Sequence, residues 1–397
     1  MKYDFDRLIN RTNTHSVKWD KHILKEFFET DDVLPLWVAD MDFECPQPVV
    51  EAVKQKASEE IYGYSWHKTP EYFDAVIRWM DRRHDWLIKS DWITYSPGVV
   101  PAIDIMIRAF SNVGDKVIVQ TPVYYPFFSA IKNNGRQLLQ NELKFENNKY
   151  TIDFDDFEEK AKDPQTKIFV FCSPHNPVGR VWTVDELKKL GDICLENDVL
   201  VISDEIWNDL ILTGYKHTIF SDVDEDFKDN SIICTAPSKT FNMAGLQMSN
   251  IIIPNKKLRE SFSFSISRQN SLGIPNAFGI VALIAAYEEG EDWLTQVMEY
   301  IEDNFRFIKG FLEEKLPDVS MVNPEGTYLA WINCSNLVMN DEERKEFLLK
   351  KAKVALDSGS IFGPGGEGFE RINVACPRTI LEECMNLIYN AIQEEKG

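Results

Sequence analysis

The chain has 397 residues and an acidic balance, with 43 lysines and arginines against 64 aspartates and glutamates, a formal net charge of −21. Because no basic patch offsets this charge, nucleic acid is excluded as an expected partner. No apolar run approaches the roughly 18–20 residues of a membrane-spanning helix, and the opening residues do not resemble a signal peptide. The length accommodates a large hydrophobic core, in two domains or in one large domain.

The cysteine pattern points to a reducing compartment. The seven cysteines are odd in number, dispersed along the chain and without a C-x-x-C pair. This usage is typical of reduced thiols and argues against structural zinc. The six histidines are equally scattered, and none lies at metal-ligand spacing from another histidine, a cysteine or a carboxylate. We therefore expect a cytoplasmic protein without a metal site.

The first part of the chain combines an extended segment with two amphipathic helices. Residues 33–42 have an apolar core followed by acids, which suits a strand or extended piece that passes through the middle of the protein. Apolar residues at helical spacing predict helices over residues 46–61 and 70–85. The loop between these helices carries two large aromatic side chains, Tyr64 and Trp66.

From Trp92 onward, strands and helices alternate. Strands are expected at residues 93–95, 116–120, 168–172, 199–203, 231–235 and 249–253, and helices at residues 100–110, 126–133 and 184–197. Short apolar strands separated by helices predict an α/β fold with a mostly parallel sheet covered on both faces. Ligands of such sheets bind at the carboxyl ends of the strands, where Gly98, Asn176, Asp204 and Lys239 all fall.

The last third of the chain reads as helices followed by a smaller α+β unit. Helices are expected at residues 276–288, 293–316, 341–353 and 379–395, and strands at residues 328–332 and 371–374. We predict a large domain over residues 48–289 and a small α+β domain built from both termini, residues 1–47 and 290–397.

Lys239 is the strongest candidate for a catalytic residue. It follows the apolar run 232–235 and stands among small hydroxyl and apolar residues. An ammonium group in such a pocket has a lowered pKa, so that its neutral amine can act as a Schiff-base nucleophile. Upstream, Asp204 ends a buried strand and Asn176 lies in a turn after another strand. An acid for a pyridinium nitrogen, an amide for a ring oxygen and a lysine for an aldehyde together describe a pyridoxal 5'-phosphate (PLP) site.

Further positions suit the rest of such a site. The backbone of Gly98, Val99 and Val100 opens a helix directly after a strand, and the free N–H groups there suit a phosphate. Tyr124 follows another strand and could stack on a flat cofactor or be a core aromatic residue. Arg371 follows a Gly-rich turn and could fork an α-carboxylate, unless it is a structural ion-pair partner of an acid such as its neighbour Glu370.

A rival for the carboxylate-binding role is Arg378. It follows the Cys376-Pro377 dipeptide, and we expect its side chain to face solvent.

The chain resembles the fold-type I PLP enzymes related to the class I/II aminotransferases. Within them it resembles the C–S lyase branch of cystathionine β-lyases and, above all, the cystalysin-like cysteine desulfhydrases. The resemblance covers nearly the whole chain through the segments Pro35-Leu-Trp-Val-Ala-Asp-Met, Gly98-Val-Val-Pro, Thr121-Pro-Val-Tyr-Tyr-Pro-Phe-Phe, Phe171-Cys-Ser-Pro-His-Asn-Pro-Val-Gly-Arg, Ser203-Asp-Glu-Ile, Ala236-Pro-Ser-Lys-Thr-Phe-Asn, Glu325-Gly-Thr-Tyr-Leu and Gly368-Phe-Glu-Arg-Ile-Asn. It implies an aspartate aminotransferase-like fold.

The resemblance also implies roles for the cofactor residues. Lys239 forms the Schiff base with PLP, and Asp204 pairs with the pyridine nitrogen. Asn176 holds the ring oxygen, and Tyr124 stacks on the ring as a further catalytic residue. The amides of Gly98, Val99 and Val100, together with Ser238, bind the phosphate.

Three further implications concern the substrate and the assembly. Arg371 binds the substrate carboxylate, and Tyr125 is assigned to the substrate site beside it. Tyr64 matches a tyrosine that reaches the phosphate in the neighbouring subunit. The resemblance therefore implies a homodimer with shared sites.

The sequence departs from the broader aminotransferase pattern at three positions. Gln247 stands where many relatives have a phosphate-binding arginine, and Ala236 where a serine is common. Trp207 replaces a tyrosine or histidine that would help to hold the ring oxygen. Since each change removes a polar group that could bind the cofactor, we expect a looser grip on it.

The implied function is a PLP-dependent C–S β-lyase. Its substrate would be cystathionine, cysteine or an S-substituted L-cysteine, and its products a thiol or sulfide, pyruvate and ammonia. Two alternatives stay open at this point: an L-amino acid aminotransferase, and an additional regulatory role through binding of a transcription factor.

Overall fold

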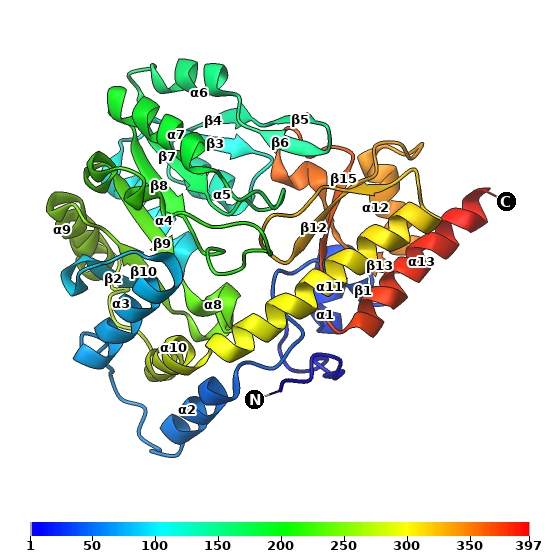
Figure 1. The fold of residues 1–397 in the computed structure, drawn as a ribbon, viewed down its shortest axis with the longest axis horizontal. Coiled ribbons are helices and arrows are strands. Elements are labelled where there is room, and N and C mark those ends of the chain that lie inside the picture. The colour runs from blue at the N-terminus through cyan, green and yellow to red at the C-terminus, as the bar shows by residue number, and fades with distance from the viewer. Residues whose placement is uncertain (1, 397) are drawn as a thin grey trace.

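A seven-stranded sheet forms the centre of the larger part of the molecule (Figure 1). The computed structural model describes residues 2–396, without the side chain of Lys396. The strand order is β2-β10-β9-β8-β7-β3-β4. The strands are β2 (Ile93–Ser96), β3 (Lys116–Thr121), β4 (Gln137–Glu142), β7 (Thr166–Cys172), β8 (Leu200–Asp204), β9 (Ser231–Thr235) and β10 (Ser249–Ile252). β10 is antiparallel to both neighbours and all other adjacent pairs are parallel, which confirms the mostly parallel mixed sheet.

Both faces of this sheet are buried. Along β3, Val117 and Val119 belong to one hydrophobic cluster and Ile118 to the other, because successive side chains point to opposite faces. The first cluster includes side chains of α4 (Val99–Phe110), α5 (Pro126–Asn133) and α9 (Lys256–Phe264), and the second includes α3 (Pro70–His84), α6 (Phe154–Ala161) and α7 (Val184–Glu196). Burial on both faces explains the nearly continuous apolar runs of these strands.

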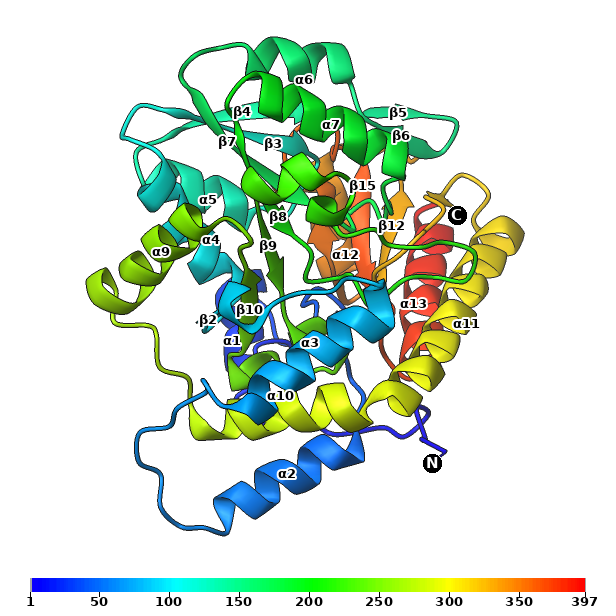
Figure 2. The ribbon, with the colours of Figure 1, turned by 60° about the vertical axis from the view of Figure 1, so that its left-hand side comes forward.

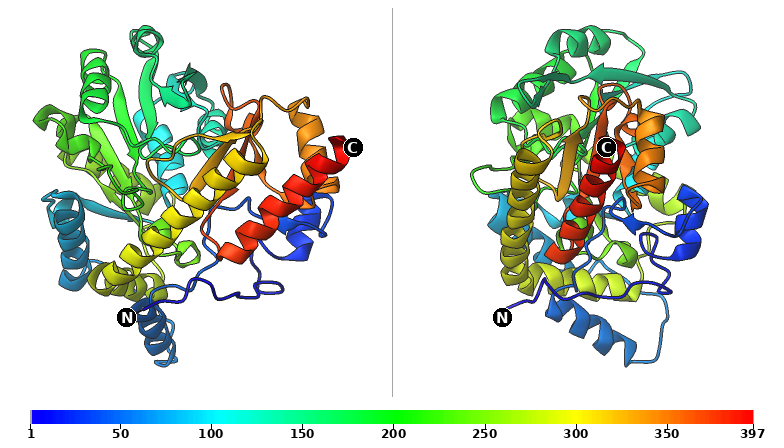
Figure 3. Two further views of the ribbon diagram at one scale, coloured as in Figure 1. Left: turned by 45° about the vertical axis from the view of Figure 1, so that its right-hand side comes forward. Right: turned by 90° about the vertical axis from the view of Figure 1, so that its right-hand side faces the viewer.

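A second, antiparallel sheet lies beside the first in the C-terminal part of the chain (Figures 2 and 3). Its order is β11-β12-β15-β14, formed by β11 (Ser320–Met321), β12 (Leu329–Asn333), β15 (Phe369–Asn373) and β14 (Asp357–Ser358). The helices of this part are α11 (Glu291–Lys315), α12 (Asp341–Lys350) and α13 (Arg378–Lys396). Near the N-terminus, α1 (Lys21–Phe28) precedes β1 (Leu34–Pro35), which pairs in parallel with β13 (Val354–Ala355). The predicted domain bounds stay a prediction.

The remaining elements surround these two sheets. They are α2 (Gln47–Ala57) and α10 (Ala277–Glu289), which pack on each other, the hairpin of β5 (Lys144–Glu146) and β6 (Lys149–Thr151), and the short α8 (Pro237–Thr240). The sequence pattern predicted none of the following elements: α1, α6, α8, α9, β4, β11, β13, β14 and the β5–β6 hairpin. Within residues 2–396, no helix is long and apolar enough to cross a membrane.

The segment predicted to be extended, residues 33–42, is a strand only in β1 and then continues as irregular backbone. Side chains from both parts of the molecule fix it in place. The Asn373 amide donates to the Val38 carbonyl at 2.7 Å and to the Asp40 carbonyl at 2.5 Å. Asn242, from the loop after α8, accepts from the Met41 N–H at 3.0 Å and donates to the Met41 and Phe43 carbonyls at 2.9 Å each.

Removal of the Asn242 side chain should destabilise the protein by about 2–3 kcal/mol, since it eliminates three hydrogen bonds at roughly 1 kcal/mol each. Asn242→Gly is the clean substitution, because the residue has a φ of 55°, which glycine adopts without strain. Denaturant unfolding measures the change. Asn386→Ala, on the exposed side of α13, removes one local hydrogen bond and should shift stability by less than about 0.5 kcal/mol. Equal effects of the two changes would contradict the prediction.

Candidate active site

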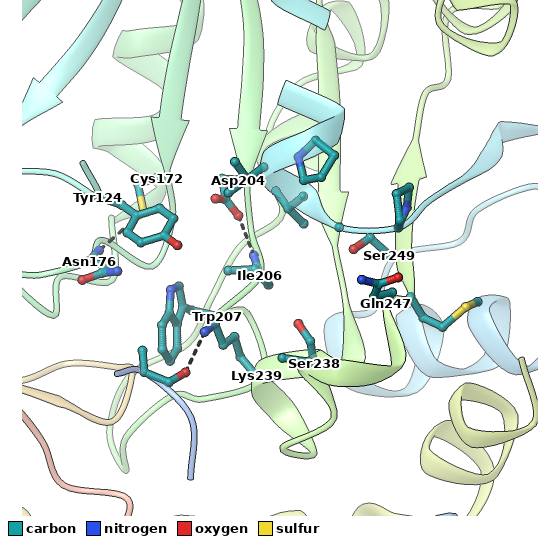
Figure 4. Close-up of a pocket in the computed structure, with 18 residues that line it drawn as sticks. Tyr124, Cys172, Asn176, Asp204, Ile206, Trp207, Ser238, Lys239, Gln247 and Ser249 are labelled. Atoms are coloured by element: carbon teal, nitrogen blue, oxygen red, sulfur yellow. Dashed lines mark hydrogen bonds between the residues drawn. The ribbon is translucent and has the colours of Figure 1, made fainter. Parts of the chain in front are cut away.

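A cavity of about 200 Å³ lies at one edge of the seven-stranded sheet, where its parallel strands end (Figure 4). Asp204 is the last residue of β8, and Lys239 lies in α8, directly after β9. The cavity brings together eight of the predicted site residues: Gly98, Val99, Val100, Tyr124, Asn176, Asp204, Ser238 and Lys239. The strand order therefore gathers side chains that are far apart in the sequence.

Lys239 is partly buried, and its amine has two close neighbours. Nζ donates a hydrogen bond to the carbonyl of Ala39 at 2.7 Å, and it lies 5.3 Å from the centre of the Trp207 ring. Burial, together with the positive charge of Arg371, lowers the pKa of Lys239 to about 8, although Asp40 and Asp204 oppose the shift. A substantial fraction of neutral amine is therefore present near neutral pH.

Asp204 is a buried acid without a cationic partner. Its Oδ1 accepts a hydrogen bond from the Ile206 N–H at 3.1 Å, and among residues 2–396 it forms no ion pair within 4 Å. Burial raises the pKa of Asp204 to about 7, even though the Ile206 N–H and the charge of Lys239 oppose the rise. A carboxylate in this state is stabilised by a positively charged N–H donor, which is what a pyridinium ring offers.

The side chains of Asn176 and Arg371 are hydrogen-bonded to each other. Nη1 of Arg371 donates to Asn176 Oδ1 at 3.1 Å, and Nη2 donates to the Trp37 carbonyl at 2.8 Å and to the carboxylate of Asp357. The guanidinium carbon also lies 4.9 Å from the centre of the Phe362 ring. Arg371 is outside the cavity lining but borders it through Asn176.

The other charged groups near Arg371 are paired elsewhere. Glu370, the acid named as a possible structural partner of Arg371, instead accepts from Arg344 at 2.7 Å. Arg378 does not face solvent as predicted: it is half-buried, donates from Nε to Asn304 Oδ1 at 2.8 Å and covers the Phe307 ring at 4.8 Å. The prediction was wrong because Asn304 and Phe307 of α11 cover the start of α13.

The two neighbouring tyrosines differ in their position. Tyr124 lines the cavity, and burial raises its pKa to about 12. Tyr125 lies outside the cavity and is 36% exposed. The Tyr125 ring centre is 5.8 Å from that of Phe362, the ring on which Arg371 stacks. Tyr125 is therefore close to the predicted carboxylate site, and its ring centre lies 5.6 Å from that of Tyr124, but it does not itself line the cavity.

The end of the cavity predicted to hold a phosphate has neutral donors. Gly98 caps the N-terminus of α4, where Val99 and Val100 supply backbone N–H groups of the first turn. Ser238, Gln247 and Ser249 also line the cavity, and Lys239 is the cation of this lining within the described part of the chain. Gln247 cannot replace the charge of the absent arginine.

Sequence reasoning missed two contributors to the site. The carbonyl of Ala39 bonds to Lys239, although its backbone lies 200 positions earlier in the chain. Asp357 bonds to Arg371 and is its register partner across the antiparallel pair of β14 and β15. A carbonyl carries no sequence signal, and a two-residue strand such as β14 has no readable period.

Tyr64 does not line the cavity of its own chain. It is fully exposed, at 100%, in the segment between α2 and α3. Large apolar side chains are also exposed in this segment and in the one before α10: Ile61, Tyr62, Trp66, Leu272 and Ile274. Such a cluster is typical of a surface that contacts another protein.

The profile of the aminotransferase class I and II family matches residues 31–388, and the chain belongs to this family. Cystathionine β-lyase PatB of Bacillus subtilis (strain 168) is 46% identical over 391 residues, which cover 98% of this chain and 100% of that protein. The resemblance to the cystathionine β-lyase branch is thereby confirmed.

Two solved structures extend the similarity to three dimensions. The PLP-bound putative aminotransferase from Clostridium difficile 630 has a TM-score of 0.96 at 45% identity and covers 98% of this chain and 100% of its own. Cystalysin from Treponema denticola, whose structure contains a pyridoxal 5'-phosphate cofactor, has a TM-score of 0.95 at 44% identity. That match covers 99% of this chain and 100% of cystalysin. The predicted aspartate aminotransferase-like fold is confirmed.

The charges around Lys239 predict opposite effects of two substitutions in the cofactor-free protein. Arg371→Gln should raise the pKa of Lys239, because a repelling charge is removed, and Asp204→Asn should lower it, because an attracting charge is removed. The pH dependence of acetic anhydride labelling, read by mass spectrometry of the Lys239 peptide, measures both. Shifts of the same sign in the two variants would show that the charges act indirectly.

Proposed function

We propose that the protein is a PLP-dependent C–S β-lyase. It cleaves cystathionine, cysteine or a related S-substituted L-cysteine to a thiol or sulfide, pyruvate and ammonia. The observation that carries the proposal is the convergence of Lys239, Asp204 and Asn176 on one cavity. The relatives support it, because 46% identity to a cystathionine β-lyase extends over 98% of the chain.

The residues of the cavity fit PLP. Lys239 binds it covalently, and Asp204 supplies the buried anion that a protonated ring nitrogen needs. Asn176 holds the ring oxygen, and Tyr124 stacks on the face of the ring. The phosphate belongs to the N-terminal turn of α4, at Gly98, Val99 and Val100, together with Ser238.

The chemistry that PLP supplies when bound is that of an electron sink, which stabilises the negative charge left at the substrate Cα after proton removal. The protein supplies the proton transfers and the orientation. Arg371 and Tyr125 bind the substrate, and Arg371 pairs with its α-carboxylate. Lys239 Nζ, once the substrate amine has replaced it on PLP and left it a free neutral amine, would take the Cα proton and then give a proton to the departing sulfur, which returns the amine to its neutral form.

The Cβ–S bond breaks in this step, and the sulfur leaves as a thiol or as sulfide. The remaining three-carbon enamine, 2-aminoacrylate, takes up water to give pyruvate and ammonia, so the sequence consumes one water and no oxidant. Ala39 and Trp207 keep the Lys239 amine at one place between its two proton transfers.

The active assembly is a cytoplasmic homodimer. The exposed Tyr64 and its apolar neighbours suit a protein interface, and Tyr64 reaches the phosphate in the partner subunit. Seven free cysteines support a reducing compartment.

An aminotransferase is the second candidate. The similarity to a putative aminotransferase at 45% identity favours it. The same site suits both reactions, because both begin with removal of the Cα proton. Incubation with L-cystathionine separates the two, since a lyase releases pyruvate and thiol without a 2-oxo acid acceptor, whereas an aminotransferase needs that acceptor.

The first functional prediction concerns Lys239. The purified holoenzyme should release pyruvate and thiol from L-cystathionine, and borohydride reduction should attach PLP covalently to the Lys239 peptide. Lys239→Ala should lose this attachment and at least about 10³-fold of the turnover, because the base is removed. Lys257→Ala, an exposed residue at the start of α9, is the control and should keep both. PLP found on another lysine of the wild-type protein would contradict the assignment.

The second functional prediction concerns sharing of sites between subunits. Tyr64→Ala and Lys239→Ala should each have low activity at limiting PLP, but a mixture of the two, dissociated and reassembled, should regain activity. Random pairing makes half of the dimers mixed, with one intact site each, so about a quarter of the wild-type activity is expected. If Tyr64 serves its own subunit, reassembly gives no gain.

A further inference from the structure

In this structure, both N–H groups of Arg371 Nη2 already donate hydrogen bonds to other groups of the protein. Nη2 carries two N–H groups and donates to two acceptors, the carbonyl of Trp37 and the carboxylate of Asp357. Nη1 donates to Asn176, whereas Nε is buried and has no hydrogen-bond partner among residues 2–396. Asp357 is equally enclosed, with an exposed fraction of 6%.

Geometry makes Nη2 indispensable for two-point binding. A guanidinium presents two parallel N–H groups to a carboxylate either end-on, from Nη1 and Nη2, or side-on, from Nε and Nη2. Both arrangements use Nη2. A ligand carboxylate that forms such a fork must therefore displace the Trp37 carbonyl or the Asp357 carboxylate.

The Asp357 carboxylate is the acceptor free to leave. Trp37 contributes a backbone carbonyl, and both flanking residues are tied down: the Leu36 N–H donates to Ala355 at 2.9 Å, and the Val38 carbonyl accepts from Asn373 at 2.7 Å. Asp357 contributes a side chain, which a rotation about χ1 withdraws while its backbone stays paired with Arg371 in the β14–β15 ladder.

A withdrawn Asp357 carboxylate would be a buried charge without its cation. Burial already raises the pKa of Asp357, and Arg371 is the group that opposes this rise. Separation from Arg371 therefore favours the protonated acid. The other groups that interact with Asp357 are Glu370 on β15, which is paired with Arg344, and Tyr124 and Tyr125 after β3.

We infer that Asp357 occupies, in the resting enzyme, the position on Arg371 that a substrate α-carboxylate takes, so that carboxylate binding displaces Asp357 and takes up one proton. The inference rests on the proposed function, in which Arg371 anchors the substrate. Asp357 thereby weakens the binding of every carboxylate that pairs with Arg371 in this way. The product pyruvate is included, so the same contact favours product release.

Acetate binding to the holoenzyme tests this inference without turnover. Calorimetry in two buffers of different ionisation enthalpy gives both the affinity and the number of protons taken up. For the wild-type protein we expect proton uptake that approaches one proton per acetate bound. In the pH range where Asp357 is ionised in the acetate-free protein, the affinity for acetate should fall by up to about tenfold per pH unit. Asp357→Asn keeps an acceptor for Arg371 but not the charge, and should bind acetate at least about tenfold more tightly, without proton uptake.

Glu370→Gln is the matched control. Glu370 is adjacent to Arg371 on β15 and is 3% exposed, but its partner is Arg344, so this variant should keep the wild-type affinity and proton uptake for acetate. Acetate binding that is unchanged or weaker in Asp357→Asn would overturn the inference and leave Asp357 as a support for Arg371. If the Asn variant does not fold, Asp357→Ser is measured against the same expectation.

Arg371→Lys distinguishes failure of the inference from failure of the proposed function. If acetate binds the wild-type protein and Arg371→Lys equally, Arg371 is not the carboxylate anchor, and the inference falls with that role. If Arg371→Lys loses acetate binding and Asp357→Asn does not gain it, the anchor stands and only the displacement of Asp357 is rejected. Pyruvate release from L-cystathionine tests the lyase activity separately.

Discussion

The irregular backbone of residues 37–42 is the constraint on which the site depends. Its carbonyls accept hydrogen bonds from side chains in two parts of the molecule. Arg371 of β15 donates to the Trp37 carbonyl, and Lys239, which follows β9, donates to the Ala39 carbonyl. Asn373 and Asn242 hold the same segment from either side. The segment thereby fixes the position of Lys239 relative to Arg371, although Lys239 lies in α8, after the seven-stranded sheet's β9, and Arg371 lies in β15 of the second sheet.

Burial acts in opposite directions on the two charged groups of the cavity. It lowers the pKa of Lys239 to about 8 and raises that of Asp204 to about 7, so each group is brought toward the pH at which both protonation states are accessible. Their mutual attraction moderates both shifts. A pyridinium ring that paired with Asp204 would oppose the rise in its pKa through an attractive charge, which is why the buried acid is a stronger argument for the cofactor than the lysine alone.

The sequence could predict those candidate residues that directly follow a strand with a recognisable apolar pattern. Lys239, Asp204 and Asn176 follow β-branched, apolar runs, and the parallel topology then requires that they meet. It could not find relations that depend on packing between distant elements. The strand β4 was missed because Gln137, Gln140 and Asn141 give it a polar character at the sheet edge. The orientation of Arg378 was wrong because it depends on Asn304, 74 positions earlier.

The departures from the aminotransferase pattern acquire a physical meaning in this site. Trp207 does not leave a void where a polar residue is common: its ring lies 4.8 Å from that of Tyr328, whose hydroxyl donates to the Ala39 carbonyl at 2.9 Å. The same carbonyl accepts from Lys239. The tryptophan is therefore part of the wall around the Lys239 amine, at a position where a tyrosine or histidine is common in the broader aminotransferase pattern. Gln247 also lines the cavity, at the end predicted to hold a phosphate, and offers a neutral amide where many relatives have an arginine.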